Sequence, residues 1–157
     1  MAGQSDGFDF EFGKWNVHHR YLKERLAGSQ DWLEFEGTSQ TWATMDGRGN
    51  VEDNHIGNPG GAYRAMAVRA YDSKTGTWAI WWIDGRNPHH LDPPVKGNFQ
   101  NGVGTFESDD TFKGKPIKVR FIWSKITSGT AHWEQAFSPD GGETWEANWE
   151  MEFTRVE

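Results

Sequence analysis

The sequence contains no cysteine among its 157 residues. Without thiols the chain cannot form disulfides or thiolate metal sites, and its redox compartment stays open. Long apolar runs are also missing, since no segment approaches the roughly 20 apolar residues of a membrane helix. Residues 1–12 lack the basic and continuous apolar regions of a signal peptide. We therefore expect a soluble, cytoplasmic protein with no membrane partner.

Basic residues are few relative to acidic ones. Lys and Arg number 16 against 23 Asp and Glu, which gives a formal net charge of −7 and a pI near 5.3. The densest basic stretch holds Arg20, Lys23 and Arg25, and Glu24 interrupts it. Such a stretch is typical of a solvated strand edge and does not form a patch for phosphates. We expect no nucleic-acid partner.

Aromatic residues are abundant, with ten Trp, ten Phe and three Tyr. Aromatic side chains favour strands, and each buries a large area. A chain of 157 residues is long enough for one domain with a real core, so we expect a single domain over residues 1–157. A core built mainly of indoles would be wide, and a wide barrel with flat walls can hold a ligand.

Alternation of apolar and polar residues is clearest near the C-terminus, in WEQAFSPDGGETWEANWEMEF. Two alternating runs flank a Gly-rich turn, which predicts an antiparallel hairpin. Strand side chains alternate between two faces, so one face of the second run should be apolar. That face carries Trp145, Ala147, Trp149, Met151 and Phe153.

Similar runs separated by turn residues recur along the whole chain and predict an antiparallel barrel of about ten strands. The expected strands are Trp15–Leu22, Trp32–Met45, Val51–Ile56, Tyr63–Tyr71, Thr77–Asp84, Val95–Phe99, Gly102–Glu107, Ile117–Thr127, Ala131–Ser138 and Trp145–Val156. Gly85–Pro94 is the longest irregular piece and either covers the barrel mouth or lies on the surface. Tyr21–Gly28 also fits a helix, but we favour a strand that continues from Trp15.

The segment from Ser138 to Trp145 matches the Asp-box pattern S-x-D-x-G-x-T-W known from sialidase propellers. The Ser and Asp side chains can satisfy backbone groups of the turn, and glycine takes the left-handed conformation. One copy cannot build a propeller, so we interpret the box as a structural turn with the Trp packed beneath it.

Gly13-Lys14-Trp15 resembles the Gly-x-Trp signature that opens lipocalin-like barrels. The resemblance implies that Trp15 closes the barrel base and that Arg155 covers it through a cation–π contact. Phe8, Phe10 and Phe12 precede the signature and could plug the same end.

Both ends of the chain resemble one uncharacterised bacterial family of lipocalin-like barrel proteins. The matching stretches are F-x-F-G-x-W-x-V-x-H at the start and E-Q-x-F-S-x-D-G-G-x-T-W-E-x-N-W at the end. The resemblance implies a calycin-type fold: all-β, with a single up-and-down barrel like those of lipocalins and fatty-acid-binding proteins. The family brings no agreed activity with it.

Six histidines are the candidate ligands for a metal or haem. His18 and His19 are adjacent on a strand and point to opposite faces, so they cannot chelate one ion together. Neither H-x-H nor H-x-x-x-H occurs, which disfavours a metal site. Haem is a rival because nitrobindin-like barrels bind it through one His, but this chain lacks the second half of their G-x-W-x-G-x-G pattern. We expect no cofactor.

The leading functional hypothesis is the binding of a small apolar or aromatic molecule inside the barrel. Arg69 and His19 would help to orient it, and Arg69 would favour a carboxylate or enolate oxygen. The predicted binding residues are Tyr21, Trp42, Trp82, Trp123, Trp133, Gln135 and Trp149.

A cofactor-independent lyase, isomerase or cyclase is the second hypothesis. His19 would be its base, Glu36 would orient that base, and Arg69 would stabilise an oxyanion. A filled barrel that serves as an interaction module is the third, and a homodimer stays open under each of them.

Overall fold

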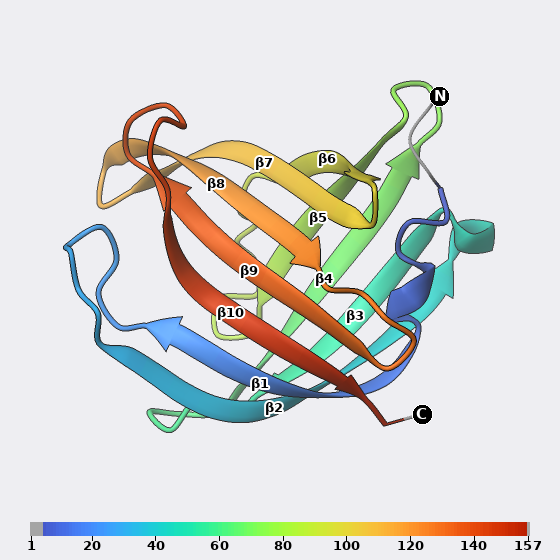
Figure 1. The fold of residues 1–157 in the computed structure, drawn as a ribbon, viewed down its shortest axis with the longest axis horizontal. Helices are drawn as coiled ribbons and strands as arrows, with labels where there is room; N and C mark the ends of the chain where they lie inside the picture. Colours follow the sequence, from blue (N-terminus) through green and yellow to red (C-terminus); the bar gives the residue numbers. More distant parts are fainter. Residues whose placement is uncertain (1–4, 157) are drawn as a thin grey trace.

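The computed structural model describes residues 5–156, which form a closed antiparallel barrel of ten strands. The strands are β1 Gly13–Leu22, β2 Trp32–Thr44, β3 Gly49–Ile56, β4 Tyr63–Asp72, β5 Thr77–Asp84, β6 Val95–Gln100, β7 Val103–Phe112, β8 Lys115–Ser124, β9 Thr130–Ser138 and β10 Glu146–Arg155. Two 3₁₀ turns, η1 (Asp9–Glu11) and η2 (Met45–Gly47), accompany them. The predicted all-β barrel is confirmed, and all ten predicted strands are present (Figure 1).

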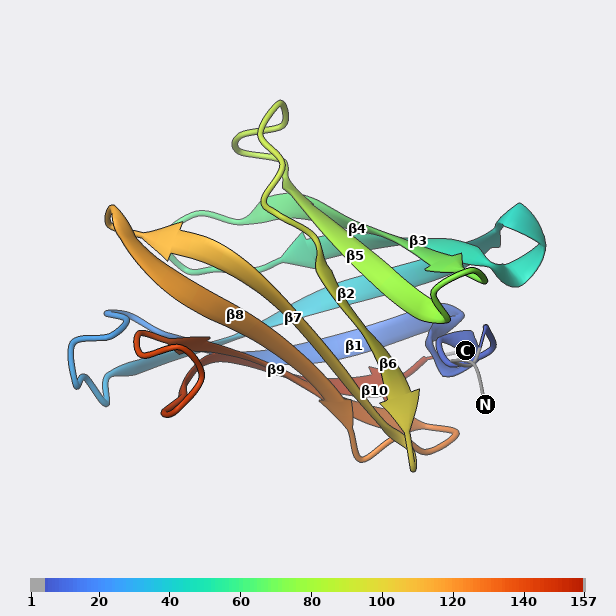
Figure 2. The same ribbon diagram turned by 90° about the horizontal axis from the view of Figure 1, so that it is seen from above.

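Each strand pairs with its sequence neighbours, and β10 closes the barrel against β1 (Figure 2). The closing ladder runs from the pair Trp15 and Arg155 to the pair Tyr21 and Trp149. Closure leaves no free sheet edge along this seam. Across residues 5–156 no helix has the length and apolar character that a membrane crossing requires.

One end of the barrel is closed by the segment that precedes β1. Phe8 is buried there and meets Trp78 at 5.0 Å and Phe99 at 4.8 Å between ring centroids. Trp15 donates from Nε1 to the backbone oxygen of Glu11 at 2.9 Å. The Arg155 guanidinium lies 4.2 Å from the Trp15 ring centroid, so the expected cation–π cover is present.

Two local expectations are wrong. The segment after β1 is neither helix nor continued strand, because the chain bends at residues 23–27.

The second concerns β10, where a bulge at Asn148 places Ala147 and Trp149 opposite consecutive residues of β9. The extra residue inverts the side-chain alternation before it. Trp145 therefore does not share the inner face of Trp149 and packs on the outside beneath Arg120, 4.1 Å away.

The opposite end of the barrel is open. There β7 continues past its expected end at Glu107 to Phe112 and turns directly into β8. Residues 78–80 of β5 pair with β6, whereas the rest of β5 diverges from it into the loop 85–94. Figure 2 shows this loop projecting from the barrel. The wall next to β5 is therefore incomplete near the mouth.

Candidate ligand cavity

A cavity of about 270 Å³ occupies the open half of the barrel. Strands β1, β4, β5 and β6 to β10 contribute to its lining, together with the end of the loop between β5 and β6. Asp92 and Pro93 of that loop border the cavity, so the loop forms part of the mouth. The aromatic walls are Tyr21, Tyr63, Trp82, Phe121, Trp133, Phe137 and Trp149.

Three indoles shape the inner part of the cavity. The ring centroid of Trp149 lies 5.8 Å from that of Trp82 and 5.4 Å from that of Trp133, and both interplanar angles are 89°. Edge-to-face packing of this kind is a favoured geometry for aromatic rings. Trp149 therefore packs against both other rings, and the three indoles offer flat apolar surface to a guest molecule.

His19 holds Trp149 in place from behind. Its Nδ1 accepts a hydrogen bond from Trp149 Nε1 at 3.1 Å, and its ring stacks on Phe35 with centroids 4.9 Å apart. Burial, with the nearby His18, lowers the pKa of His19 to about 4. The ring is therefore neutral at pH 7 and carries its proton on Nε2. His19 is not among the residues that line the cavity.

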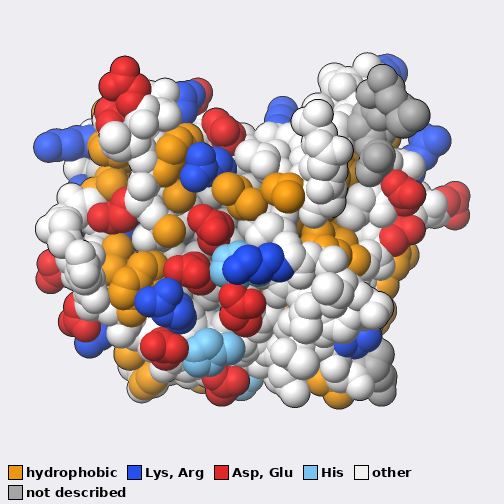
Figure 3. All heavy atoms as spheres, viewed as in Figure 1, with side chains coloured by type: hydrophobic (Ala, Val, Ile, Leu, Met, Phe, Trp, Pro, Cys, Tyr) orange, Lys and Arg blue, Asp and Glu red, His pale blue; other side chains and the backbone are white. Residues whose placement is uncertain are grey.

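Glu36 does not meet His19, because it lies on the outer face of β2. There it hydrogen-bonds His18 Nδ1, while Glu34 contacts His18 Nε2 at 2.8 Å. Hydrogen bonds that the His18 ring donates to the Glu36 and Glu34 carboxylates raise the pKa of His18. Histidine and acidic side chains gather on this outer face over β1, β2, β9 and β10 (Figure 3). Among residues 5–156 no group of three or more His, Asp or Glu is arranged to hold a metal ion.

Arg69 lies deeper, between the cavity and the closed end, where it is 3% exposed. It forms an ion pair with Glu52 and donates to Asn50 Oδ1 at 2.9 Å. A second cavity of about 20 Å³ adjoins this pair and Trp123, which is room for a single water. Because Glu52 balances its charge, Arg69 is a structural ion-pair partner here and does not face the main cavity.

Four polar side chains surround the mouth on the side of β1, β4 and β5. The Arg86 guanidinium covers the Tyr63 ring at 3.6 Å and pairs with Asp84 at 2.7 Å. Burial raises the pKa of Tyr63 to about 12, so its hydroxyl stays protonated. Arg25 follows β1 and stacks over Tyr21 at 4.3 Å.

Gln135 is the polar group on the β9 wall of the cavity. Its Nε2 donates to Oδ1 of the bulge residue Asn148 at 2.8 Å. That hydrogen bond fixes the amide so that the Gln135 oxygen remains as the acceptor. The bulge therefore helps to orient a polar group of the cavity.

The predicted binding residues fall into three places. Tyr21, Trp82, Trp133, Gln135 and Trp149 surround the main cavity together. Trp123 borders the small second cavity instead. The interior position expected for Trp42 is wrong, because this side chain is 47% exposed on the outside of β2.

The predicted catalytic residues are not brought together. His19 lies behind Trp149, Arg69 is paired with Glu52, and Glu36 is exposed on the outer face. The orienting role of Glu36 is therefore wrong, since its side chain contacts His18 and not His19. Adjacent residues of a strand point to opposite faces, so His18 points outward where His19 points inward. Glu36 lies on the outer face beside His18.

Sequence reasoning missed Arg25 and Tyr63 at the mouth and Glu52 in the interior. Arg25 lies in Tyr21–Gly28, which fits either a helix or a strand by sequence, so its side chain could not be assigned to a face. The inward position of Glu52 could have been inferred from the alternation of β3. Glu52 lies on the same buried face as Asn50, Asn54 and Ile56. A polar face, however, normally predicts exposure to solvent.

Comparison with known proteins assigns no family to the chain. No protein-family model matches the sequence. No curated protein matches it either. The cavity, its aromatic walls and the charges at its mouth are therefore the observations from which a function is inferred.

Proposed function

We propose that the barrel binds a small, flat, largely apolar or aromatic molecule in the cavity at its open end. The observation that carries the proposal is the indole of Trp149, which packs edge-to-face against both Trp82 and Trp133 in the wall of a cavity of about 270 Å³. Ligand sites are typically concave and apolar, with a few placed polar groups and roughly 300–1,000 Å³ of volume. The cavity volume lies just below the lower end of that range, which favours a compact fused-ring molecule.

We also propose that the chain is a single lipocalin-like domain. The cover of Trp15 by Arg155 and the closed ten-strand barrel support this assignment. In such a barrel one end is closed by packed side chains while the other admits the ligand. Phe8 at one end and the mouth residues at the other fit that division of roles.

The enzymatic alternative draws no support from the placement of its predicted residues. His19 lies behind Trp149 and uses Nδ1 to accept its hydrogen bond, so binding Trp149 and accepting a proton at that atom exclude each other. A binding site needs no such group. Binding is therefore the function that the geometry favours.

The test is a titration with N-phenyl-1-naphthylamine, an uncharged aromatic probe that fluoresces in apolar surroundings. The wild-type protein should bind it saturably, and Trp82→Ala should weaken the affinity at least about tenfold through loss of the wall. Trp42→Ala is the matched control, since it removes an exposed indole from the outside of the barrel and should leave binding unchanged.

A second variant is needed because Trp82→Ala could lose the probe through misfolding. Val119 lines the cavity and is 7% exposed, so Val119→Phe adds a ring to the cavity while the residue stays apolar. We expect this variant to lose the probe and keep the native far-ultraviolet circular dichroism spectrum. Probe binding that survives in both variants, or is absent from the wild type, would reject the proposal.

A further inference from the structure

Arg25 projects a guanidinium group into the wall of the cavity. The group stacks over Tyr21 at 4.3 Å and lies 5.4 Å from the Phe137 ring centroid. Both aromatic residues line the cavity, as does Arg25 itself. Stacking on two rings fixes the plane of the guanidinium and leaves its edge for hydrogen bonds.

That edge has no partner within residues 5–156. The Nε and Nη2 atoms of Arg25 are both buried, and neither makes a hydrogen bond. These two nitrogens lie on the same edge of the planar group, which is the edge that binds a carboxylate through two parallel hydrogen bonds. Buried donors are rarely left unpaired, so two on one edge call for an explanation.

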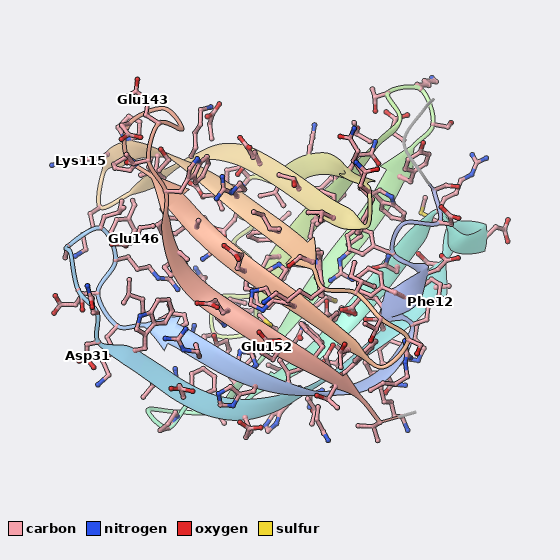
Figure 4. The ribbon with its side chains drawn as sticks, viewed as in Figure 1. Phe12, Asp31, Lys115, Glu143, Glu146 and Glu152 are labelled. Atoms are coloured by element: carbon pink, nitrogen blue, oxygen red, sulfur yellow. The ribbon has the colours of Figure 1, made fainter. Side chains whose placement is uncertain are left out.

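The carboxylates near the mouth have other partners. Asp84 pairs with Arg86 at 2.7 Å, and Asp92 contacts His90 at 3.1 Å. Glu146 begins β10 where the loop after β1 approaches it (Figure 4), and its Oε1 accepts the backbone N–H of Leu26 at 2.6 Å. No ion pair joins Arg25 to any acidic side chain among the described residues.

Asp84 and Asp92 both line the cavity, and a third acidic residue of the lining disfavours an anion beside it. Asp110 of β7 also borders the cavity, and its Oδ1 accepts the backbone N–H of Thr111 at 2.7 Å. Its carboxylate would repel an anion placed beside it. The anion position is therefore on the side of β1 and β9, where Arg25 lies over Tyr21 and Phe137.

We infer that the ligand carries a carboxylate or a similar planar anion, which the Nε and Nη2 edge of Arg25 binds at the mouth of the cavity. This inference rests on the proposed binding function and narrows its ligand class. The anionic group would lie at the mouth, and the aromatic body would extend inward against Trp133 and Trp149. The charge-assisted pair would then satisfy both buried donors of Arg25.

Burial lowers the pKa of Arg25, with desolvation as the main cause. An arginine remains protonated in proteins, so burial leaves the Arg25 charge poorly solvated. An anion at the Nε and Nη2 edge would relieve that desolvation. Arg69, the arginine predicted for this role, already has Glu52 as its counter-ion.

The experiment compares two probes of equal shape, naphthalene-2-carboxylate and the uncharged naphthalene-2-carboxamide, by quenching of tryptophan fluorescence. The variants are Arg25→Gln, which removes the charge, and Arg25→Lys, which keeps the charge without the fork. Arg120→Gln is the matched control. Arg120 stacks on Trp145 outside the barrel at 4.1 Å, and its Nε is also buried without a partner.

The wild-type protein and Arg120→Gln should bind the carboxylate about tenfold or more tightly than the carboxamide. Arg25→Gln should bring the two affinities together by weakening the carboxylate alone, and Arg25→Lys should fall in between. Unchanged carboxamide binding in Arg25→Gln would show that the variant is folded.

Equal binding of the two probes by the wild type would overturn the anion inference and leave the cavity as a site for neutral molecules. A preference for the carboxylate that persists in Arg25→Gln would overturn it as well. Failure of the wild type to bind either probe would reject the proposed function itself.

Discussion

At the scale of single residues, the most unusual group is the carboxyl of Glu11, which is 0% exposed at the closed end of the barrel. Its Oε2 accepts from Thr41 Oγ1 at 3.1 Å, and its Oε1 has no partner among the described residues. Burial, followed by the nearby Glu52, raises the pKa of Glu11 well above its ordinary value of 4.5. The protonated acid is therefore the form that suits the fold.

This pKa shift predicts that Glu11→Gln becomes more stable relative to the wild type as the pH rises above 4.5. The wild-type contribution of Glu11 to stability is full below pH 4.5 and is lost as the pH rises towards the raised pKa. The loss amounts to about 1.4 kcal/mol in the free energy of unfolding per pH unit within that interval. Glutamine does not titrate, so the variant should not show this loss.

Urea unfolding at about pH 5 and about pH 7 measures the effect. Glu143→Gln is the control, because Glu143 is exposed at the tip of the β9–β10 turn, where it points away from the barrel (Figure 4). If wild type and Glu11→Gln lose stability equally between the two pH values, Glu11 is ionised in the fold and the prediction fails.

At the scale of elements, the turn between β9 and β10 shows how side chains can organise a hairpin. Ser138 Oγ donates to Asp140 Oδ1 at 2.8 Å and accepts the N–H of Gly142 at the same distance. Asp140 in turn accepts from the Thr144 backbone and hydroxyl at 2.8 and 2.5 Å. Gly141 and Gly142 take positive φ, which only glycine adopts without strain. Residues 138–145 therefore form a turn that is held together by its own side chains.

Asp140→Ala should loosen this hairpin. The hydrogen bonds from Thr144 lower the pKa of Asp140 to about 2, so its stabilising contribution is present above the ordinary pKa of 3.8. That contribution disappears as the pH falls through about 2. At neutral pH the variant should lower Tm and speed hydrogen exchange at the Gly142 and Thr144 amides.

Glu143→Ala is the control for this variant, because it changes an exposed side chain of the same turn. Its Tm and its amide exchange should match the wild type. Unchanged exchange at Thr144 in Asp140→Ala would mean that the strands hold the turn without help from the carboxylate.

At the scale of the whole molecule, the two ends of the barrel differ in how they are filled. The closed end contains Phe8, which meets Phe106 and Trp123 as well as the Arg69 guanidinium at 4.7 Å. The open end contains a cavity of about 270 Å³ whose wall includes Trp82, Trp133 and Trp149. The same aromatic content thus stabilises one half of the barrel and shapes a cavity in the other.

Phe8→Ala should destabilise the molecule by about 3–5 kcal/mol in the free energy of unfolding, because it empties a packed site. Phe112→Ala serves for comparison, since Phe112 is half-buried at the end of β7 and its ring contacts that of Phe137. Phe112→Ala should lower the free energy of unfolding by clearly less than Phe8→Ala. Equal losses in urea denaturation would show that the Phe8 end is packed no better than the mouth.

Strand order and barrel class could be predicted because their signals are local. Alternation with period two and Gly-rich or Asp-rich turns appear within about ten residues of one another, and each strand pairs with its sequence neighbours. The same locality placed Trp133, Gln135 and Trp149 on one inner face. It failed where one extra residue, Asn148, shifted the alternation of β10.

Trp42 shows a second limit of local reasoning. In β2 the inward positions beside it hold Ser39 and Thr41, and the indole faces out. The polar residues point inward because they hydrogen-bond to buried acids: Ser39 Oγ donates to Glu52 Oε2 at 2.7 Å. A pattern that takes apolar residues as interior cannot detect a polar interior.

The sequence by itself determined the ten strands, their order and most of the aromatic wall, because side-chain alternation and turn chemistry act between near neighbours. Only the tertiary structure decided which charges are balanced. Arg69 meets Glu52 across the barrel interior, whereas Arg25 reaches the cavity mouth with an unpaired edge. Such pairing depends on distances through space, and those distances exist only after β10 has closed against β1.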